Sequence, residues 1–270
     1  MKFTAQLLIA VLICFPHVFA ADKSSSLTIR QVEDVQWGYL NPLRGDKSPG
    51  AAELWGDRTK DVATGMLVRF KPGFSSPAHI HNVTYRGLVI EGLLHNDDPK
   101  AAKVWMPPSS FWTQPAGDNH ITAAAGDKNL IFLEIDRGPY LVKPSNAQFD
   151  SRETAINVHA SNLVWLSGNE LTFIDNDKVE IAMLWGGTNY GEVGGALVKF
   201  PAGFNGKIDV EATEFRAVVI KGGVVRTDSG QLHNLSAGSY FGSTGQFEHK
   251  VTSVKEVLIY FRTDGVYRIY

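Results

Sequence analysis

The sequence predicts an all-β protein made of two homologous antiparallel barrels or sandwiches. Short runs rich in Val, Ile, Phe and Trp, such as 65–70, 85–90 and 129–135, alternate with Gly, Pro, Asn and Asp roughly every ten residues. No stretch joins a 3.6-residue apolar period to helix caps, which argues against βαβ units and their nucleotide sites. An internal repeat then divides this β-rich chain into two similar halves.

The composition is that of a globular protein with little net charge. Of 270 residues, 44% are hydrophobic, and 26 Lys and Arg stand against 28 Asp and Glu, giving a formal net charge of -2. The chain therefore offers no excess of basic residues to neutralise phosphates, and we expect no nucleic-acid partner.

The first twenty residues have the pattern of a secretory signal peptide. A basic start at Lys2 is followed by the apolar run Leu7–Phe15 and by small residues at Ala20 and Ala21. We expect cleavage after Ala20 and a periplasmic or secreted mature protein. The apolar run is shorter than the roughly 20 residues that span a bilayer, so no stable membrane anchor is expected. Cys14, the single cysteine, lies in this segment, so the mature chain is expected to lack disulfides and thiolate ligands.

The internal repeat holds without a gap at an offset of 130 residues over much of each half. The matched segments are 54–56 with 184–186, 67–70 with 197–200, 73–74 with 203–204, 85–86 with 215–216, and 89–92 with 219–222. After short deletions, 110–112 match 239–241, His120 matches His249, and 131–133 match 259–261. The polar stretch 143–148 interrupts two apolar runs, so we predict an N-terminal domain over 21–148 and a C-terminal domain over 149–270.

Three histidines of the first half are the best candidates for a metal site. His79 and His81 are two residues apart on a predicted strand, so both imidazoles point to one face. His120 completes a facial set if the strand after the turn at 115–117 returns beside the first. Three imidazoles suit Fe, Zn, Cu, Ni or Mn, and they leave coordination positions open for water, oxygen or substrate.

These residues stand in the order and spacing of the cupin motifs. Gly73, His79, His81 and Gly92 match the first motif, and 115–120 matches the second, Pro-x-Gly-x-x-His. The chain thus resembles the cupins, and the resemblance implies two tandem cupin (double-stranded β-helix, jelly-roll) barrels. It also implies that His79, His81 and His120 are metal ligands.

One position departs from the cupin pattern. Tyr85 stands where the family usually carries a metal-binding Glu, with Arg86 next to it. This resembles the three-histidine cupins of the anti-sigma-factor and dioxygenase-like group. The second motif is also incomplete, because Ser109 and Ala124 replace its usual Gly and Asn. Glu134, on a neighbouring predicted strand, is an alternative source of a carboxylate.

The second half has lost the three histidines. Asp209 and Glu211 stand at the positions of His79 and His81, and only His249 keeps its imidazole. We predict a degenerate cupin domain with a structural or interface role. An Asp, Glu and His set is also able to bind a hard cation, so a second ion stays open.

Tyr85 and Arg86 are the candidate catalytic residues. The Tyr85 hydroxyl could hydrogen-bond a bound water or substrate, and Arg86 could pair with an anionic substrate. Aromatic residues 105, 111 and 112 could line the mouth of the barrel. The pair Phe111–Trp112 recurs as Tyr240–Phe241 in the half without the metal motif, which favours a core role for that pair.

The sequence predicts an exported mononuclear metalloenzyme that acts on a small polar organic substrate, and the resemblance to three-histidine cupins implies that it is dioxygenase-like. One divalent transition metal is expected, with Fe first and Zn, Mn, Ni or Cu also compatible. The absence of a mature cysteine excludes a thiol dioxygenase with a Cys–Tyr crosslink. Two alternatives stay open: a non-catalytic small-molecule or metal-binding sensor cupin, and a metal-dependent lyase, isomerase or hydrolase. A third interpretation is an interaction protein that forms a homo-oligomer through exposed barrel edges.

Overall fold

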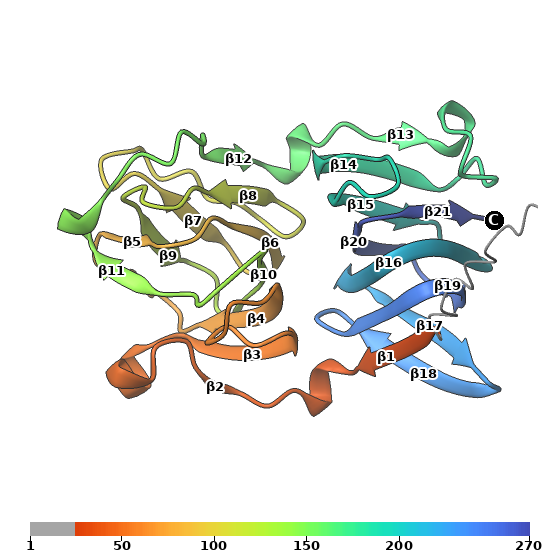
Figure 1. The fold of residues 1–270 in the computed structure, drawn as a ribbon, viewed down its shortest axis with the longest axis horizontal. Coiled ribbons are helices and arrows are strands. Elements are labelled where there is room, and N and C mark those ends of the chain that lie inside the picture. Colours follow the sequence, from red (N-terminus) through yellow and green to blue (C-terminus); the bar gives the residue numbers. More distant parts are fainter. Residues whose placement is uncertain (1–24) are drawn as a thin grey trace, which may run out of the picture.

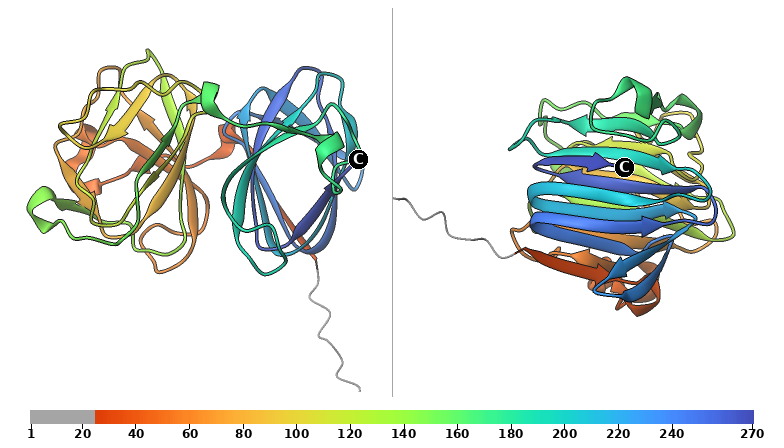
Figure 2. Two further views of the ribbon diagram at one scale, coloured as in Figure 1. Left: turned by 90° about the horizontal axis from the view of Figure 1, so that it is seen from above. Right: turned by 90° about the vertical axis from the view of Figure 1, so that its right-hand side faces the viewer.

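The computed structural model describes residues 25–270 (Figure 1). The predicted signal peptide lies outside these residues, so its cleavage and the export of the protein stay predictions. The described chain is almost entirely β-structure, which confirms the predicted fold class. None of its helices is long and apolar enough to cross a membrane. Two barrels lie side by side, one from each half of the chain (Figure 2).

The first barrel is built on a seven-stranded antiparallel sheet with the order β12-β8-β6-β10-β4-β3-β2, and two small sheets, β11-β5 and β7-β9, complete it. Its elements are β2 (Gly38–Tyr39), η2 (Pro42–Lys47), β3 (Gly50–Trp55), β4 (Thr64–Phe70), β5 (His79–His81), β6 (Tyr85–Glu91), β7 (Leu94–Asp97), β8 (Phe111–Gln114), β9 (Ile121–Ala124), β10 (Asn129–Ile135), β11 (Val142–Pro144), η3 (Ser145–Ala147) and β12 (Ile156–Val158).

The second barrel is built on a ten-stranded sheet whose main path is β13-β14-β15-β20-β16-β19-β17-β18. Strand β1 pairs with β19 and β21 pairs with β16. The elements are β1 (Ser26–Arg30), η1 (Val32–Asp34), η4 (Ala160–Asn162), β13 (Leu166–Ser167), η5 (Gly168–Glu170), β14 (Glu180–Gly186), β15 (Gly194–Phe200), β16 (Asn205–Lys221), β17 (Gly223–Asp228), β18 (Gln231–Ser236), β19 (Tyr240–Thr252), β20 (Val257–Thr263) and β21 (Val266–Ile269).

Two strands cross between the halves that the sequence defines. Strand β1 precedes the first repeat but pairs with β19, where Ile29 lies opposite Phe241. Strand β12 follows residue 148 but pairs with β8, where Asn157 lies opposite Trp112. The domain boundary near residue 148 stays a prediction. Strands β1 and β12 each belong to the barrel on the other side of that boundary.

Strands at the centre of the molecule have two buried faces, because one face lines a barrel and the other packs against the second barrel. On β6, Val89 belongs to the interior of the first barrel, whereas Leu88 and Ile90 belong to the apolar cluster between the barrels. The alternation of side chains along a strand explains this division. It also decides which way the two candidate catalytic residues point, since Tyr85 and Arg86 are neighbours on this strand.

Candidate metal centre

The fold brings the three predicted histidines together inside the first barrel. His79 and His81 lie on β5, and His120 comes just before β9. The backbones of His79 and His120 form an antiparallel bridge, with an N–H···O=C hydrogen bond of 3.0 Å in each direction. One ring nitrogen from each of the three residues lies within 4.8 Å of the others, and no other such group of His, Cys, Asp or Glu occurs within residues 25–270. The predicted facial arrangement is therefore present.

The turn before His120 depends on a glycine. Gly117 has φ +82°, and a Cβ atom there would lie 2.3 Å from the carbonyl oxygen of Phe149. The Gly117 N–H donates to the carbonyl oxygen of His81 at 2.8 Å. A side chain at position 117 would strain the left-handed backbone and clash with Phe149, so the glycine holds the turn against β5.

Backbone contacts orient two of the rings. The Nδ1 atoms of His79 and His120 lie 2.8 and 3.0 Å from the carbonyl oxygens of Pro77 and Asp118. A carbonyl only accepts, so Nδ1 carries the proton and Nε2 keeps its lone pair in both rings. His81 differs: its Nε2 lies 3.2 Å from the Tyr140 hydroxyl, and its buried Nδ1 has no hydrogen-bond partner among the described residues.

The three rings are neutral at physiological pH. Burial lowers the pKa of His79, and burial together with the neighbouring His120 and His79 holds the pKa of His81 well below its usual range. Burial, reinforced by His79, lowers the pKa of His120 to about 3. Neutral imidazoles with free lone pairs are the form that binds divalent metals, so the donor set fits a transition-metal ion.

Tyr85 faces the histidines at the end of a chain of buried amides. Its hydroxyl donates to Asn96 Oδ1 at 2.9 Å and lies 3.3 Å from His120 Nε2. The Asn96 amide donates to Gln114 Oε1 at 2.8 Å, which fixes the Asn96 oxygen toward Tyr85. Burial raises the pKa of Tyr85 far above its usual range. The hydroxyl therefore stays protonated and acts as a hydrogen-bonding group.

His79 and His81 line a cavity of about 310 Å³. Its wall is largely apolar, and Tyr85, Trp112 and Tyr140 contribute aromatic surface. Two exposed cations, Arg44 from η2 and Lys143 from β11, also line it. Neither Arg44 nor Lys143 makes an ion pair within residues 25–270. The cavity beside the histidines therefore has two positive charges that no carboxylate in the described part of the chain balances in an ion pair.

Comparison with known proteins assigns the chain to a family. The family described as Domain of unknown function (DUF4437) matches residues 28–270, which is most of the chain. The chain belongs to this family. No curated protein matches it.

Solved structures similar to this DUF4437 protein share its fold at low sequence identity. A proposed dioxygenase from Nostoc punctiforme has a TM-score of 0.67 and 14% identity, over 89% of this chain and 83% of that chain. Salicylate 1,2-dioxygenase from Pseudoaminobacter salicylatoxidans, crystallised with gentisate, has a TM-score of 0.56 and 12% identity, over 79% and 73%. AerE from Microcystis aeruginosa has a TM-score of 0.55 and 12% identity, over 85% and 96%. The cupin fold predicted from the motifs is confirmed.

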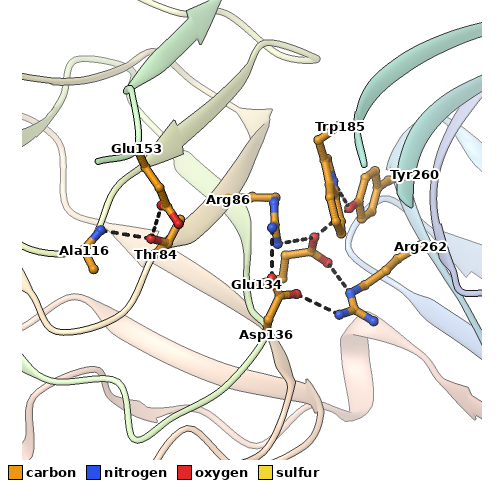
Figure 3. A network of polar contacts seen from close by, with 9 residues as sticks. All are labelled: Thr84, Arg86, Ala116, Glu134, Asp136, Glu153, Trp185, Tyr260 and Arg262. Atoms are coloured by element: carbon orange, nitrogen blue, oxygen red, sulfur yellow. Dashed lines mark hydrogen bonds and ion pairs between the residues drawn. The ribbon is translucent and has the colours of Figure 1, made fainter. Parts of the chain in front are cut away.

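Arg86 does not reach the centre. It points away from the cavity to the junction of the barrels, where its Nη2 pairs with Asp136 at 2.9 Å and its guanidinium lies 3.6 Å from the ring centre of Trp185 (Figure 3). Because neighbouring residues on a strand face opposite sides, an inward Tyr85 forces Arg86 outward. The expectation that Arg86 binds the substrate therefore has no geometric support.

Glu134 also lies at the junction and supplies no ligand to the histidines. Its side chain is 1% exposed and accepts a 2.7 Å hydrogen bond from the Tyr260 hydroxyl of the second barrel (Figure 3). Arg86 and Arg262 approach its two oxygens at 3.8 and 3.6 Å. Of the aromatic pair, Trp112 lines the cavity and Phe111 packs between the barrels.

The second repeat does not rebuild a metal site. Asp209 and Glu211 alternate with the buried Val210 on β16, so both point away from the barrel interior. His249 is buried, and its Nε2 lies 3.0 Å from the Ser243 hydroxyl. The loss of the site from this half stays a prediction; within residues 25–270, Asp209, Glu211 and His249 do not gather into a metal-binding group.

Several residues of the site were not identified from the sequence. They are Arg44, Asn96, Gln114, Tyr140 and Lys143. A further histidine, His95 on β7, is also buried, with 1% of its surface exposed. The alternation of side chains along β7 could have indicated that Asn96 points into the barrel. The other residues lie in segments that come close to the histidines only when the barrel closes, so nothing in the sequence pointed to them.

Proposed function

We propose that this protein is a mononuclear metalloenzyme, dioxygenase-like, that acts on a small anionic organic substrate. The observation that carries the proposal is the set of three neutral histidines, with ring nitrogens within 4.8 Å of one another, at a cavity of about 310 Å³. His79, His81 and His120 would hold one divalent metal, iron foremost. When bound, such an ion supplies Lewis acidity and, if redox-active, dioxygen activation.

Two cations at the cavity favour an anionic substrate. Arg44 and Lys143 come from two different elements of the cavity wall, η2 and β11, and no carboxylate within residues 25–270 forms an ion pair with them. A carboxylate group would pair with them while the rest of a small molecule fills the apolar and aromatic interior. The folds of salicylate 1,2-dioxygenase and this chain are similar, so hydroxybenzoates are sensible first substrates to test.

Two tyrosines of the cavity would orient the histidines and the substrate. Tyr140 stacks on His81 with ring centres 4.4 Å apart and packs that ring in place. Tyr85 presents its hydroxyl oxygen beside His120, because the hydroxyl proton is engaged by Asn96. The Tyr85 oxygen is therefore able to accept a hydrogen bond from a substrate hydroxyl or a water molecule.

Oxygen uptake tests the proposed function. The iron-loaded protein is expected to consume dioxygen with one of a panel of salicylates, gentisates and β-diketones, whereas the zinc-loaded protein is not, since Zn has no accessible redox change. The methyl ester of an active carboxylate should react with a raised KM. Turnover by Zn, Mn or Ni forms without oxygen would replace the proposal with lyase, isomerase or hydrolase chemistry. Tight binding without turnover in every metal form would favour a binding or sensor protein.

Tyr85→Phe is expected to reduce turnover about tenfold or more while leaving metal content nearly unchanged. The change removes the hydroxyl beside His120 but no ring nitrogen. Steady-state kinetics and metal analysis on the same samples measure both effects. The matched control is Tyr267→Phe, which alters a partly buried tyrosine packed against the core of the second barrel. Equal loss of metal and turnover in Tyr85→Phe would instead give Tyr85 a role in holding the metal.

A further inference from the structure

Arg226 places a charged group inside the second barrel. It lies on β17 two residues after Val224, which belongs to the barrel core, so the two side chains share the inner face. Arg226 is 0% exposed, and its guanidinium lies 5.7 Å from the ring centre of Phe247 on β19. A full positive charge is therefore held among apolar side chains.

No group within residues 25–270 forms an ion pair with this charge. The only hydrogen bond from the guanidinium within residues 25–270 runs from Nε to His249 Nδ1 at 3.3 Å. Both Nη atoms are buried and have no hydrogen-bond partner in the described part of the chain. Asp228 acts on Arg226 only through space, and burial keeps His249 neutral by lowering its pKa to about 3. A buried unpaired charge costs several kcal/mol, and arginine does not escape the cost by losing its proton.

The position of Arg226 relates it to the metal centre of the first barrel. At the repeat offset, Arg226 corresponds to Asn96, which hydrogen-bonds Tyr85 beside the three histidines. His249 corresponds to His120. The first barrel gathers neutral metal-binding side chains in this region, whereas the second barrel places a permanently charged guanidinium there. The region in the second barrel therefore favours an anion over a cation.

We propose that the second barrel binds a small monovalent inorganic anion, such as a halide, against the Nη groups of Arg226. Two orphaned Nη groups supply four N–H donors, and one negative charge balances the single guanidinium. The guanidinium lies beside Phe247 and the neutral ring of His249, and Phe215 packs against that ring. The free-energy cost of removing water from a weakly hydrated halide is lower than that for a divalent oxyanion, so a halide suits these apolar surroundings better. This site is independent of the proposed metalloenzyme function.

Thermal unfolding of the full chain tests the anion site. In sodium chloride or bromide the Tm is expected to rise about 3–5 °C for each tenfold increase in halide above the dissociation constant, and sodium gluconate at equal ionic strength should not reproduce the rise. Arg226→Gln should remove the difference between the salts. The control Arg137→Gln changes an exposed arginine and should retain it.

A second measurement covers the case in which Arg226→Gln does not fold. Crystals of the wild-type chain grown in sodium bromide should show an anomalous peak within hydrogen-bond distance of the Arg226 Nη atoms. A Tm that responds equally to chloride and gluconate, or a bromide crystal with only water beside these atoms, would overturn the proposal.

Discussion

Replacing His81 by alanine is expected to reduce bound divalent metal from near one equivalent per chain to a small fraction, with the β-structure retained. His79→Ala and His120→Ala should do the same, because each removes one of three ring nitrogens that lie within 4.8 Å of one another. Loss of a ligand weakens a metal site more than the roughly 10- to 100-fold cost of disturbing a residue behind a ligand. Elemental analysis of untagged protein measures metal content, and circular dichroism measures the fold.

His249→Ala is the matched control for the three histidine variants. It removes a buried imidazole at the equivalent position of the second barrel, where no group of His, Cys, Asp or Glu within residues 25–270 gathers around it. Metal content in this variant should stay near one equivalent. If all three first-barrel variants kept their metal, the assignment of the site would be rejected.

The sequence predicted the histidine site because its information is local. His79 and His81 share a strand, and Gly117 shapes the turn three residues before His120, so spacing alone carried most of the geometry. The same alternation could have placed Arg86 outside the barrel, since an inward Tyr85 requires its neighbour to point outward. Arg86 was assigned to the substrate because of its positive charge, although the alternation of side chains along the strand places it on the opposite face from Tyr85.

The rest of the site depends on contacts between distant segments. Tyr140 reaches His81 because β11 pairs with β5, and β1 joins β19 across more than half of the chain. No spacing rule connects such segments. Asp209 and Glu211 differ again: a register shift between Ala212 and Phe215 lets β16 turn these two side chains outward while Phe215 stays in the core. A β-bulge of this kind leaves little trace in a single sequence.

The second large effect is expected at Glu134, which joins the barrels. Glu134→Ala should lower the free energy of unfolding by about 3–5 kcal/mol, because it leaves the Tyr260 hydroxyl and two guanidinium groups without a buried carboxylate. Urea unfolding followed by fluorescence measures the loss. The control Asp61→Ala breaks the exposed pair with Arg137 and should cost about 0–1 kcal/mol.

Glu134→Gln separates the charge of this residue from its packing. Burial raises the pKa of Glu134 above its ordinary value of 4.5, although Arg262 and Arg86 oppose the rise. The folded state then holds the proton more tightly than the unfolded chain, so the contribution of Glu134 to stability falls as the pH rises from 4.5 through the folded pKa. The glutamine variant keeps an acceptor for Tyr260 and does not titrate, so its stability should lack this component of the pH dependence. A loss as large as that of Glu134→Ala at neutral pH, which shrinks as the pH falls through 4.5, would instead show that the ionised carboxylate itself holds the two barrels together.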